Sequence, residues 1–173
     1  MKMIFAVGPN HEFGLSNGSL PWNHVKEDMQ HFNKFTQGTI PVMGRKTWES
    51  LPDAKLPRRQ CVIISQSGEV EDPRDSIVCG NVPLALAKAT ELAGGNTESV
   101  CIIGGSNLLL STAGMVTQLS ISCISEYAMK TPHWGLTTSY LPILDILHAT
   151  GMKGLVDYNT ILSTEKVIIT LIK

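Results

Sequence analysis

The stretch Val100-Cys101-Ile102-Ile103-Gly104-Gly105-Ser106 sets a run of apolar residues directly before a pair of glycines. A short apolar run that ends at turn residues is typical of a buried strand. A helical pattern over 106–113 follows the glycines, so the stretch predicts a strand, a tight turn and a helix. Such strand–turn–helix units are the building blocks of α/β proteins.

Apolar runs and helical patterns alternate along most of the chain, which predicts an α/β fold with a largely parallel sheet. Only Ser163-Thr164-Glu165 separates the last two apolar runs, so we expect a hairpin and an antiparallel edge there. We predict one domain over residues 1–173, with an eight-stranded sheet and about four flanking helices. The expected strands are 2–7, 40–43, 60–65, 76–79, 100–103, 118–125, 155–162 and 166–172, and the expected helices are 25–36, 45–50, 83–93 and 106–113.

Composition and charge exclude several classes of protein. The 173 residues are 43% hydrophobic and 17% charged, which is ordinary for a folded globular domain and argues against disorder. A net charge of −1 gives no support for nucleic acid or an anionic membrane as a partner. The apolar N-terminal run stops at Gly8, too early for a signal peptide, and no segment reaches the length of a membrane span. We expect a monomer that acts on a small molecule, with a homodimer left open.

The four cysteines, Cys61, Cys79, Cys101 and Cys123, lie in separate apolar runs. None belongs to a C-x-x-C pair, and no Cys/His cluster has zinc-site spacing, so we expect neither a bound metal nor a disulfide. Free buried thiols behave as small hydrophobes and are typical of a reducing compartment. The expected location is therefore the cytoplasm.

One carboxylate in the first expected helix lies close to its apolar side. The residues Val25, Met29, Phe32 and Thr36 recur at helical spacing and predict a buried stripe, and Asp28 lies about 60° from the middle of that stripe. The solvent face of this helix is expected to carry Lys26, Glu27, Gln30, His31 and Lys34. Two interpretations stay open: an acid that interacts with the helix dipole, or an acid that binds two parallel N–H donors on a flat ligand.

Two turns have the chemistry of phosphate sites. Gly44 leads into Arg45-Lys46-Thr47, the expected first turn of a helix, where exposed N–H groups and two cations suit phosphate, although a solvated basic pair fits equally. The Gly104-Gly105 pair lets a ligand approach the backbone before the next helix. The full G-x-G-x-x-G motif is absent from the sequence, which argues against an ordinary Rossmann dehydrogenase.

Three ordered blocks of sequence carry a resemblance to a known family. They are Phe5-Ala6-Val7 followed by Phe13-Gly14-Leu15-Ser16-Asn17-Gly18-Ser19-Leu20-Pro21-Trp22, then Val42-Met43-Gly44-Arg45-Lys46-Thr47-Trp48-Glu49-Ser50-Leu51, and Ile102-Ile103-Gly104-Gly105. These blocks resemble the dihydrofolate reductase family. The resemblance covers residues 1–126 well and the rest loosely, and it makes phosphate binding at the two turns the favoured interpretation.

The resemblance implies NADPH-dependent reduction of 7,8-dihydrofolate to 5,6,7,8-tetrahydrofolate. This reaction supports one-carbon metabolism and thymidylate synthesis, and it is the step that antifolates inhibit. A hydride would pass from nicotinamide C4 to pterin C6, and N5 would gain a proton. Three residues would carry the chemistry: Asp28 would hold the pterin through its amino group and N3–H, Trp22 would orient a water nearby, and Ser122 would bond both the acid and the pterin.

The resemblance also assigns the two ligand-binding surfaces. Substrate-binding residues would be Ile4, Ala6, Met29, Phe32, Leu51, Leu56, Arg59 and Ile103. Cofactor-binding residues would be Val7, Phe13, Gly14, Ser19, Leu20, Gly44, Arg45, Lys46, Thr47, Ser65, Gln66, Gly104, Gly105, Ser106, Asn107, Leu108 and Leu109, with the adenosine portion at about 40–95.

The chain departs from the family pattern at several of these places. Arg58 replaces the usual glycine before Arg59, the residue that matches the family's clamp for the glutamate tail, so either arginine could supply the clamp. Gln66 stands where some members have serine, and Leu109 where tyrosine is frequent. The segment 138–142 loosely matches a cofactor-side strand, with threonine where many members have aspartate.

Two other functions remain open at this stage. One is a reductase of the same fold that acts on another pyrimidine-like heterocycle, such as a riboflavin precursor. The other is a catalytically idle homologue that binds folate or NADPH and has a structural role. The combination of Asp28, Phe32 and Arg59 favours folate over the first of these. The intact loop from Gly8 to Trp22, the acid and the Gly104-Gly105 pair argue against the second.

Overall fold

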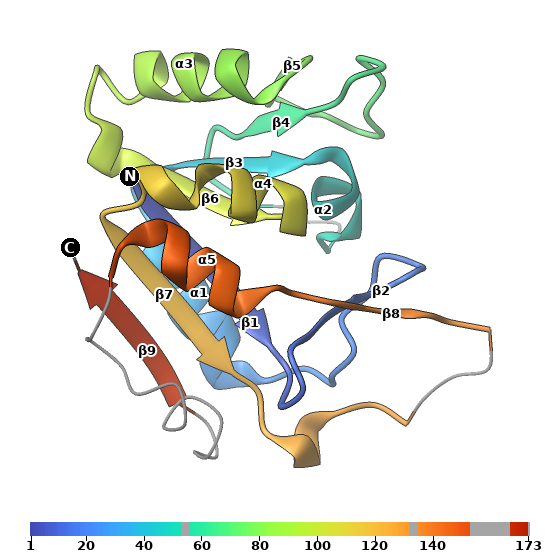
Figure 1. Ribbon diagram of the computed structural model, residues 1–173. Helices are drawn as coiled ribbons and strands as arrows, with labels where there is room; N and C mark the ends of the chain where they lie inside the picture. Colours follow the sequence, from blue (N-terminus) through green and yellow to red (C-terminus); the bar gives the residue numbers. More distant parts are fainter. Residues whose placement is uncertain (53–55, 132–134, 153–166, 173) are drawn as a thin grey trace.

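The computed structural model describes residues 1–52, 56–131, 135–152 and 167–172 (Figure 1). None of the helices in these ranges is long and apolar enough to cross a bilayer. The strands are β1 Lys2–Val7, β2 Glu12–Leu15, β3 Ile40–Gly44, β4 Val62–Ile64, β5 Ile77–Cys79, β6 Val100–Gly104, β7 Gln118–Cys123, β8 Thr138–Tyr140 and β9 Val167–Ile172. The helices are α1 Lys26–Thr36, α2 Arg45–Ser50, α3 Val82–Leu92, α4 Ser106–Thr112 and α5 Ile143–Thr150, with short 3₁₀ turns η1 Thr97–Ser99, η2 Ala113–Met115 and η3 Glu126–Ala128.

The described strands form a seven-stranded sheet in the order β5-β4-β3-β6-β1-β7-β9, and β2 and β8 form a separate pair. Every neighbouring pair in the large sheet is parallel except β7 and β9. The predicted α/β class, the largely parallel sheet and the antiparallel edge are therefore confirmed. The expected strand at 155–162 lies outside the described residues.

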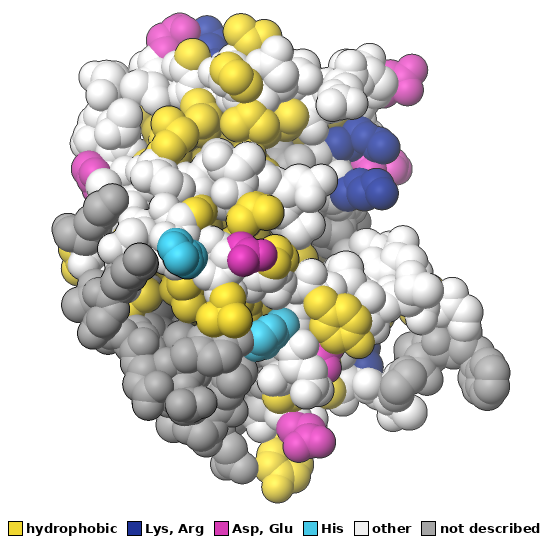
Figure 2. Space-filling view, viewed as in Figure 1, with side chains coloured by type: hydrophobic (Ala, Val, Ile, Leu, Met, Phe, Trp, Pro, Cys, Tyr) yellow, Lys and Arg dark blue, Asp and Glu magenta, His cyan; other side chains and the backbone are white. Residues whose placement is uncertain are grey.

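The two faces of the sheet bury two separate apolar clusters, because successive side chains of a strand point to opposite faces. Met3 and Phe5 of β1 join the larger cluster with residues of α3, α4 and α5, whereas Ile4 joins the smaller one beside α1 and α2. Apolar side chains are also visible on the surface over α3 and α4 (Figure 2). Leu84 of α3 and Leu110 of α4 are exposed. The strand alternation thus decides which residues of β1 reach the α1 side of the sheet.

Strand β2 and helix α5 went unpredicted, and β8 was anticipated only through the loose match at 138–142. The two strands are short and pair with each other. Strand β8 is polar, and Phe13 of β2 packs against the larger cluster, so neither strand carries a long alternating apolar pattern. Helix α5 does carry a readable pattern, because Ile143, Ile146 and Thr150 are buried at helical spacing. The helix ends at Gly151, whose φ of +70° is a left-handed cap that glycine adopts freely.

The predicted buried stripe of the first helix was partly wrong. Thr36 is buried as predicted, but His31 is half-buried and its Nε2 lies 2.7 Å from Ser120 Oγ, so it does not belong to the solvent face. Phe35 packs against the smaller apolar cluster beside Phe32. The face of α1 that meets the sheet is therefore rotated toward His31 and Phe35, which leaves Met29 free to line a cleft.

The neighbouring leucines of α4 test the packing of the larger cluster. Leu109 is fully buried, whereas Leu110 is 40% exposed. We expect Leu109→Ala to lower the free energy of unfolding by about 2–5 kcal/mol, because it leaves a cavity in the core. Leu110→Ala should cost less than about 1 kcal/mol. Urea unfolding followed by circular dichroism measures both, and equal losses would contradict this packing.

Candidate functional site

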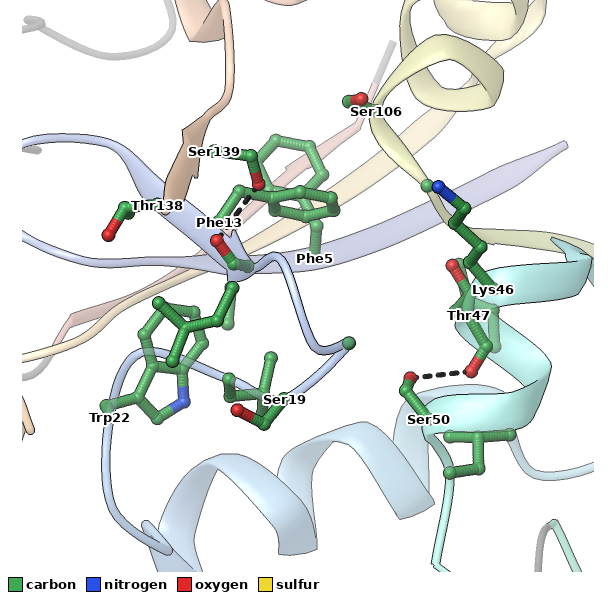
Figure 3. A pocket seen from close by; sticks show the side chains of 18 of the residues that line it. Phe5, Phe13, Ser19, Trp22, Lys46, Thr47, Ser50, Ser106, Thr138 and Ser139 are labelled. Carbon is green, nitrogen blue, oxygen red and sulfur yellow. Dashed lines mark hydrogen bonds between the residues drawn. The ribbon is translucent and has the colours of Figure 1, made fainter. Parts of the chain in front are cut away.

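A cleft of about 530 Å³ opens where β1 and β6 end, between α1 and α2 and beside the β2–β8 pair (Figure 3). The carboxyl ends of parallel strands are the usual ligand-binding edge of an α/β sheet. The structure brings together much of the predicted site here. The predicted residues that line the cleft are Ile4, Ala6, Phe13, Gly14, Ser19, Leu20, Trp22, Asp28, Met29, Phe32, Lys46, Thr47, Leu51, Ile103, Gly105 and Ser106.

The acid lies in the first turn of α1, on the wall of the cleft. Asp28 is half-buried, and Met29, Phe32 and Ile4 are among the apolar residues that line the same space. Glu27, the neighbouring acid, is exposed and does not line the cleft. The helical phase in the sequence therefore correctly placed Asp28, and not Glu27, on the inward side of the helix. A carboxylate in such surroundings favours a ligand that offers it N–H donors.

The chain that leads into α1 is held by backbone hydrogen bonds to the segment after β7. Trp22 is buried and forms an isolated antiparallel bridge with Met129, and the Asn23 N–H donates to the Ala128 carbonyl over 2.8 Å. These bonds hold the indole of Trp22 between the loop and the helix that carries Asp28. Trp22 also lines the cleft, as predicted.

Ser122 lies on β7 directly opposite Ala6 of β1. Its side chain is buried, and no described residue hydrogen-bonds its Oγ. A buried hydroxyl without a partner is uncommon in proteins and calls for a donor or acceptor from a ligand or water. Ser122 itself does not line the cleft, but its pairing partner Ala6 does.

The loop that carries Gly14, Ser16 and Leu20 crosses the cleft and is hydrogen-bonded to β8 and to the segment before it. Ser16 donates its backbone N–H to the Thr137 carbonyl over 2.9 Å, and Ser139 Oγ donates to the Gly14 carbonyl over 3.1 Å (Figure 3). Lys130 Nζ donates to the Leu20 carbonyl over 2.9 Å. These contacts hold the loop across the mouth of the cleft.

Two helices begin beside each other on the opposite wall. Gly44 precedes α2 and Gly105 precedes α4, and a Cβ built on Gly44 would lie 3.7 Å from the Gly105 nitrogen. Gly104 has a φ of +132°, a backbone geometry that other residues rarely adopt. Lys46 lines the cleft from α2 and points toward α4 (Figure 3). One cation and two glycine turns therefore share this wall, which suits an anionic group.

Arg45, the other cation of this turn, is engaged elsewhere. Its guanidinium pairs with Glu49 one turn along α2, with Nη1 3.2 Å from Oε1, and it does not line the cleft. Ser65, predicted near the adenosine end, donates its hydroxyl to the Glu69 carbonyl over 2.8 Å inside a turn. The neighbouring Gln66 is exposed.

The two arginines after Leu56 have different environments. Arg59 Nη2 donates to the backbone carbonyl of Asn33 on α1 over 3.0 Å, so this side chain reaches the helix that carries the acid. Arg58 is exposed and has a φ of +61°, the left-handed region that glycine prefers. The turn therefore keeps the backbone shape that a glycine would give it.

The remaining predicted residues lie outside the cleft lining. Leu108 and Leu109 are buried in the larger apolar cluster together with Val7, so the core covers these three side chains. Their predicted contact with the cofactor stays a prediction. The full set outside the lining is Val7, Gly44, Arg45, Leu56, Arg59, Ser65, Gln66, Gly104, Asn107, Leu108, Leu109 and Ser122.

Other residues of the lining were not predicted. Five of them lie inside the sequence blocks that carry the resemblance but were given no role there, and Thr138 and Ser139 lie in the loose match at 138–142. They are Phe5, Leu15, Ser16, Gly18, Ser50, Thr137, Thr138 and Ser139.

Fold and cleft together define an α/β protein that binds small ligands at the carboxyl ends of its parallel strands, with an acid on one wall and a cation on the other. The family model described as dihydrofolate reductase matches residues 1–134. The chain therefore belongs to the dihydrofolate reductase family, as the sequence blocks predicted.

Curated relatives and a solved structure agree with this assignment. Dihydrofolate reductase type 8 of Escherichia coli is 35% identical over 130 residues, which is 73% of this chain and 75% of that protein. Dihydrofolate reductase of Neisseria meningitidis serogroup B is 35% identical over 143 residues, or 78% and 83% of the two chains. The fold is similar to that of Enterococcus faecalis dihydrofolate reductase complexed with NADP(H) and RAB-propyl, with a TM-score of 0.63 and 24% identity over 82% of this chain and 76% of that one.

The left-handed backbone at Arg58 gives a test of the turn before Arg59. A non-glycine residue in this region costs about 1–2 kcal/mol, so Arg58→Gly should leave the free energy of unfolding unchanged or raise it by up to about 1 kcal/mol after the entropy of the unfolded chain is included. Arg59→Gly should lower it, because the bond to Asn33 is lost. Urea unfolding of both variants checks this, and a clear loss in Arg58→Gly would contradict the turn geometry.

Proposed function

We propose that this protein reduces 7,8-dihydrofolate to 5,6,7,8-tetrahydrofolate with NADPH, by hydride transfer from nicotinamide C4 to pterin C6 and protonation of N5. The observation that carries the proposal is Asp28 on an apolar wall of the same cleft whose other wall holds Lys46 and the Gly104–Gly105 turn. Family membership and the names of the relatives support it. The product would feed one-carbon metabolism and thymidylate synthesis.

At the substrate end, Asp28 would accept two N–H bonds, one from the pterin amino group and one from N3. Two parallel acceptors on a carboxylate match this edge, and the apolar contacts of Met29 and Phe32 suit the flat faces of the ring. The unpartnered Oγ of Ser122 would be satisfied by the acid or the pterin. Asp28 would favour protonation of N5 through a water and need not donate the proton itself.

At the cofactor end, the residues present fit a dinucleotide. Lys46 and the backbone N–H groups at the starts of α2 and α4 would hold its phosphates, and the adenosine portion would lie along residues 40–95. When bound, NADPH supplies a hydride, which carries both electrons of the reduction. A preference for NADPH over NADH would depend on Arg45 and on the turn at 65–67. Arg45 would give up its ion pair with Glu49 and bind the phosphate instead.

The loop would keep water away from the reacting rings. Leu20 and Phe13 line the cleft from this loop, and its ties to Thr137, Ser139 and Lys130 give it a fixed position across the mouth. A dry slot that presses two flat rings together supplies much of the rate in a hydride transfer.

The expected location and assembly also remain part of the proposal. All four cysteines are free thiols, which fits a reducing compartment such as the cytoplasm. We propose that the chain acts as a monomer.

The direct assay is loss of absorbance at about 340 nm when purified protein is mixed with NADPH and dihydrofolate, a wavelength at which the reduced nicotinamide absorbs. Turnover with dihydrofolate is the expected result. Turnover only with another pyrimidine-like heterocycle would support the first rival function. Tight NADPH binding without any turnover would support an idle homologue.

Asp28→Asn tests the role of the acid. We expect kcat for dihydrofolate to fall about 100-fold or more, because the amide offers one donor where the ligand needs two acceptors and cannot favour N5 protonation. The affinity for NADPH and the unfolding midpoint should stay near wild type. Glu27→Gln is the matched control, since its side chain is exposed and lies outside the cleft lining. Near-normal turnover of Asp28→Asn at neutral pH would refute the assignment.

The clamp for the glutamate tail is tested by the two adjacent arginines. We expect Arg59→Ala to raise KM for dihydrofolate about 10-fold or more with little change in kcat, because a charge-assisted bond far from the reacting atoms is lost. Arg58→Ala, which replaces an exposed side chain, should leave KM within about 2-fold. If steady-state kinetics showed a larger rise in KM for Arg58→Ala than for Arg59→Ala, the clamp would be assigned to Arg58.

A further inference from the structure

A chain of polar side chains crosses the sheet edge beneath α1. His31 Nε2 lies 2.7 Å from Ser120 Oγ, and Ser120 Oγ lies 3.3 Å from Thr170 Oγ1. Ser120 is fully buried, so its hydroxyl depends on these two partners. The three residues come from α1, β7 and β9, which the sequence separates widely.

This polar chain starts one helical turn from the acid. Asp28 and His31 are three residues apart on α1, a spacing that places two side chains on neighbouring parts of one helix face. Ser120 and Ser122 are two apart on β7 and face the same side of the sheet. The two helix residues therefore face the two strand residues. His31 is matched with Ser120, and the acid is matched with the unpartnered hydroxyl of Ser122.

The first half of α1 has few other attachments to the sheet. Thr36, at the far end, is the one buried residue of the helix, and Phe32 and Phe35 are only partly buried. Val25 is the N-cap residue, and its side chain forms no capping hydrogen bond with the helix. Within the described part of the chain, the bond between His31 and Ser120 is the side-chain hydrogen bond that joins α1 to the large sheet.

We propose that His31 is a positioning residue for the reaction proposed above: through its hydrogen bond to Ser120 it holds the Asp28-bearing turn of α1 against β7. The inference rests on the proposed function, because the position matters through the ligand that Asp28 binds. Rotation or displacement of α1 at this end would move the Asp28 carboxylate relative to Ser122. Misplacement by about 1 Å is enough to cost roughly 100-fold in rate.

Burial favours the neutral imidazole of His31, which lowers its pKa. Burial lowers the pKa of His31 below its ordinary 6.5, the Asp28 carboxylate raises it, and Lys34 lowers it. On β1, Lys2 places its Nζ over the Phe35 ring at 5.5 Å, and β7 and β9 contribute the uncharged Ser120 and Thr170. A folded-state pKa below the unfolded value means that stability is full above about pH 6.5 and is lost as the pH falls through the folded pKa.

The kinetic test compares two replacements of His31 with a matched control. His31→Phe keeps the approximate shape but removes the bond to Ser120, and we expect kcat/KM for dihydrofolate to fall roughly 10- to 100-fold. His31→Gln can still bond the serine and should restore most of the loss at pH 7.5. His148→Gln, an exposed histidine of α5, is the control and should match wild type. Equal activity of His31→Phe and the control would overturn the proposal.

A second comparison separates positioning from general stability. In an Asp28→Asn background, His31→Phe should cause no further loss of kcat/KM, because the acid that it positions is gone. A loss as large as in the wild-type background would show a merely structural role and overturn the proposal.

A measurement without dihydrofolate keeps the inference testable if the protein turns over another substrate or none. Amide hydrogen exchange over residues 26–31 should speed up about 5-fold or more in Ser120→Ala and stay unchanged in His148→Gln. Unchanged exchange in Ser120→Ala would overturn the inference. An NMR titration should also give His31 a lower pKa in Asp28→Asn than in wild type, and equal values would refute the electrostatic interaction between the two groups.

Discussion

The parallel pairing of β1 with β6 on one side and β7 on the other is the constraint on which the site depends. Because side chains alternate along each strand, this register puts Met3 and Phe5 into the larger core and turns Ile4 and Ala6 toward α1. The same register sets Ser122 opposite Ala6. A slip of one residue would exchange the two faces and remove the cleft wall.

Three separate segments then complete the site around these strand ends. Helix α1 brings Asp28 to the apolar wall, α2 brings Lys46 to the opposite wall, and the loop across the mouth brings Trp22 and Leu20. Each of these segments is held by hydrogen bonds to another part of the chain. The cleft therefore has few charged side chains, and these point into it from opposite walls. Such a lining suits a slot that must hold flat rings in a dry environment.

Much of this could be read from the sequence where a local rule governs the outcome. The strand before Gly104, the helix after it and the choice of Asp28 over Glu27 all follow from periodicity. Two failed predictions concern contacts with distant partners: β2 is a strand because it pairs with β8, and His31 is half-buried beside Ser120 of β7, to which it is hydrogen-bonded. Helix α5 was missed although its buried residues recur at helical spacing. Leu109, which the resemblance assigned to the cofactor, is surrounded by the core.

The central claim, that the cleft brings a nicotinamide and a pterin into contact for hydride transfer, is tested most directly by isotope transfer. A single turnover with NADPH that carries deuterium at the transferable C4 position should give tetrahydrofolate with the deuterium at C6, as mass spectrometry and NMR would show. Tetrahydrofolate without the label at C6, or no product from protein that binds both ligands, would contradict the account.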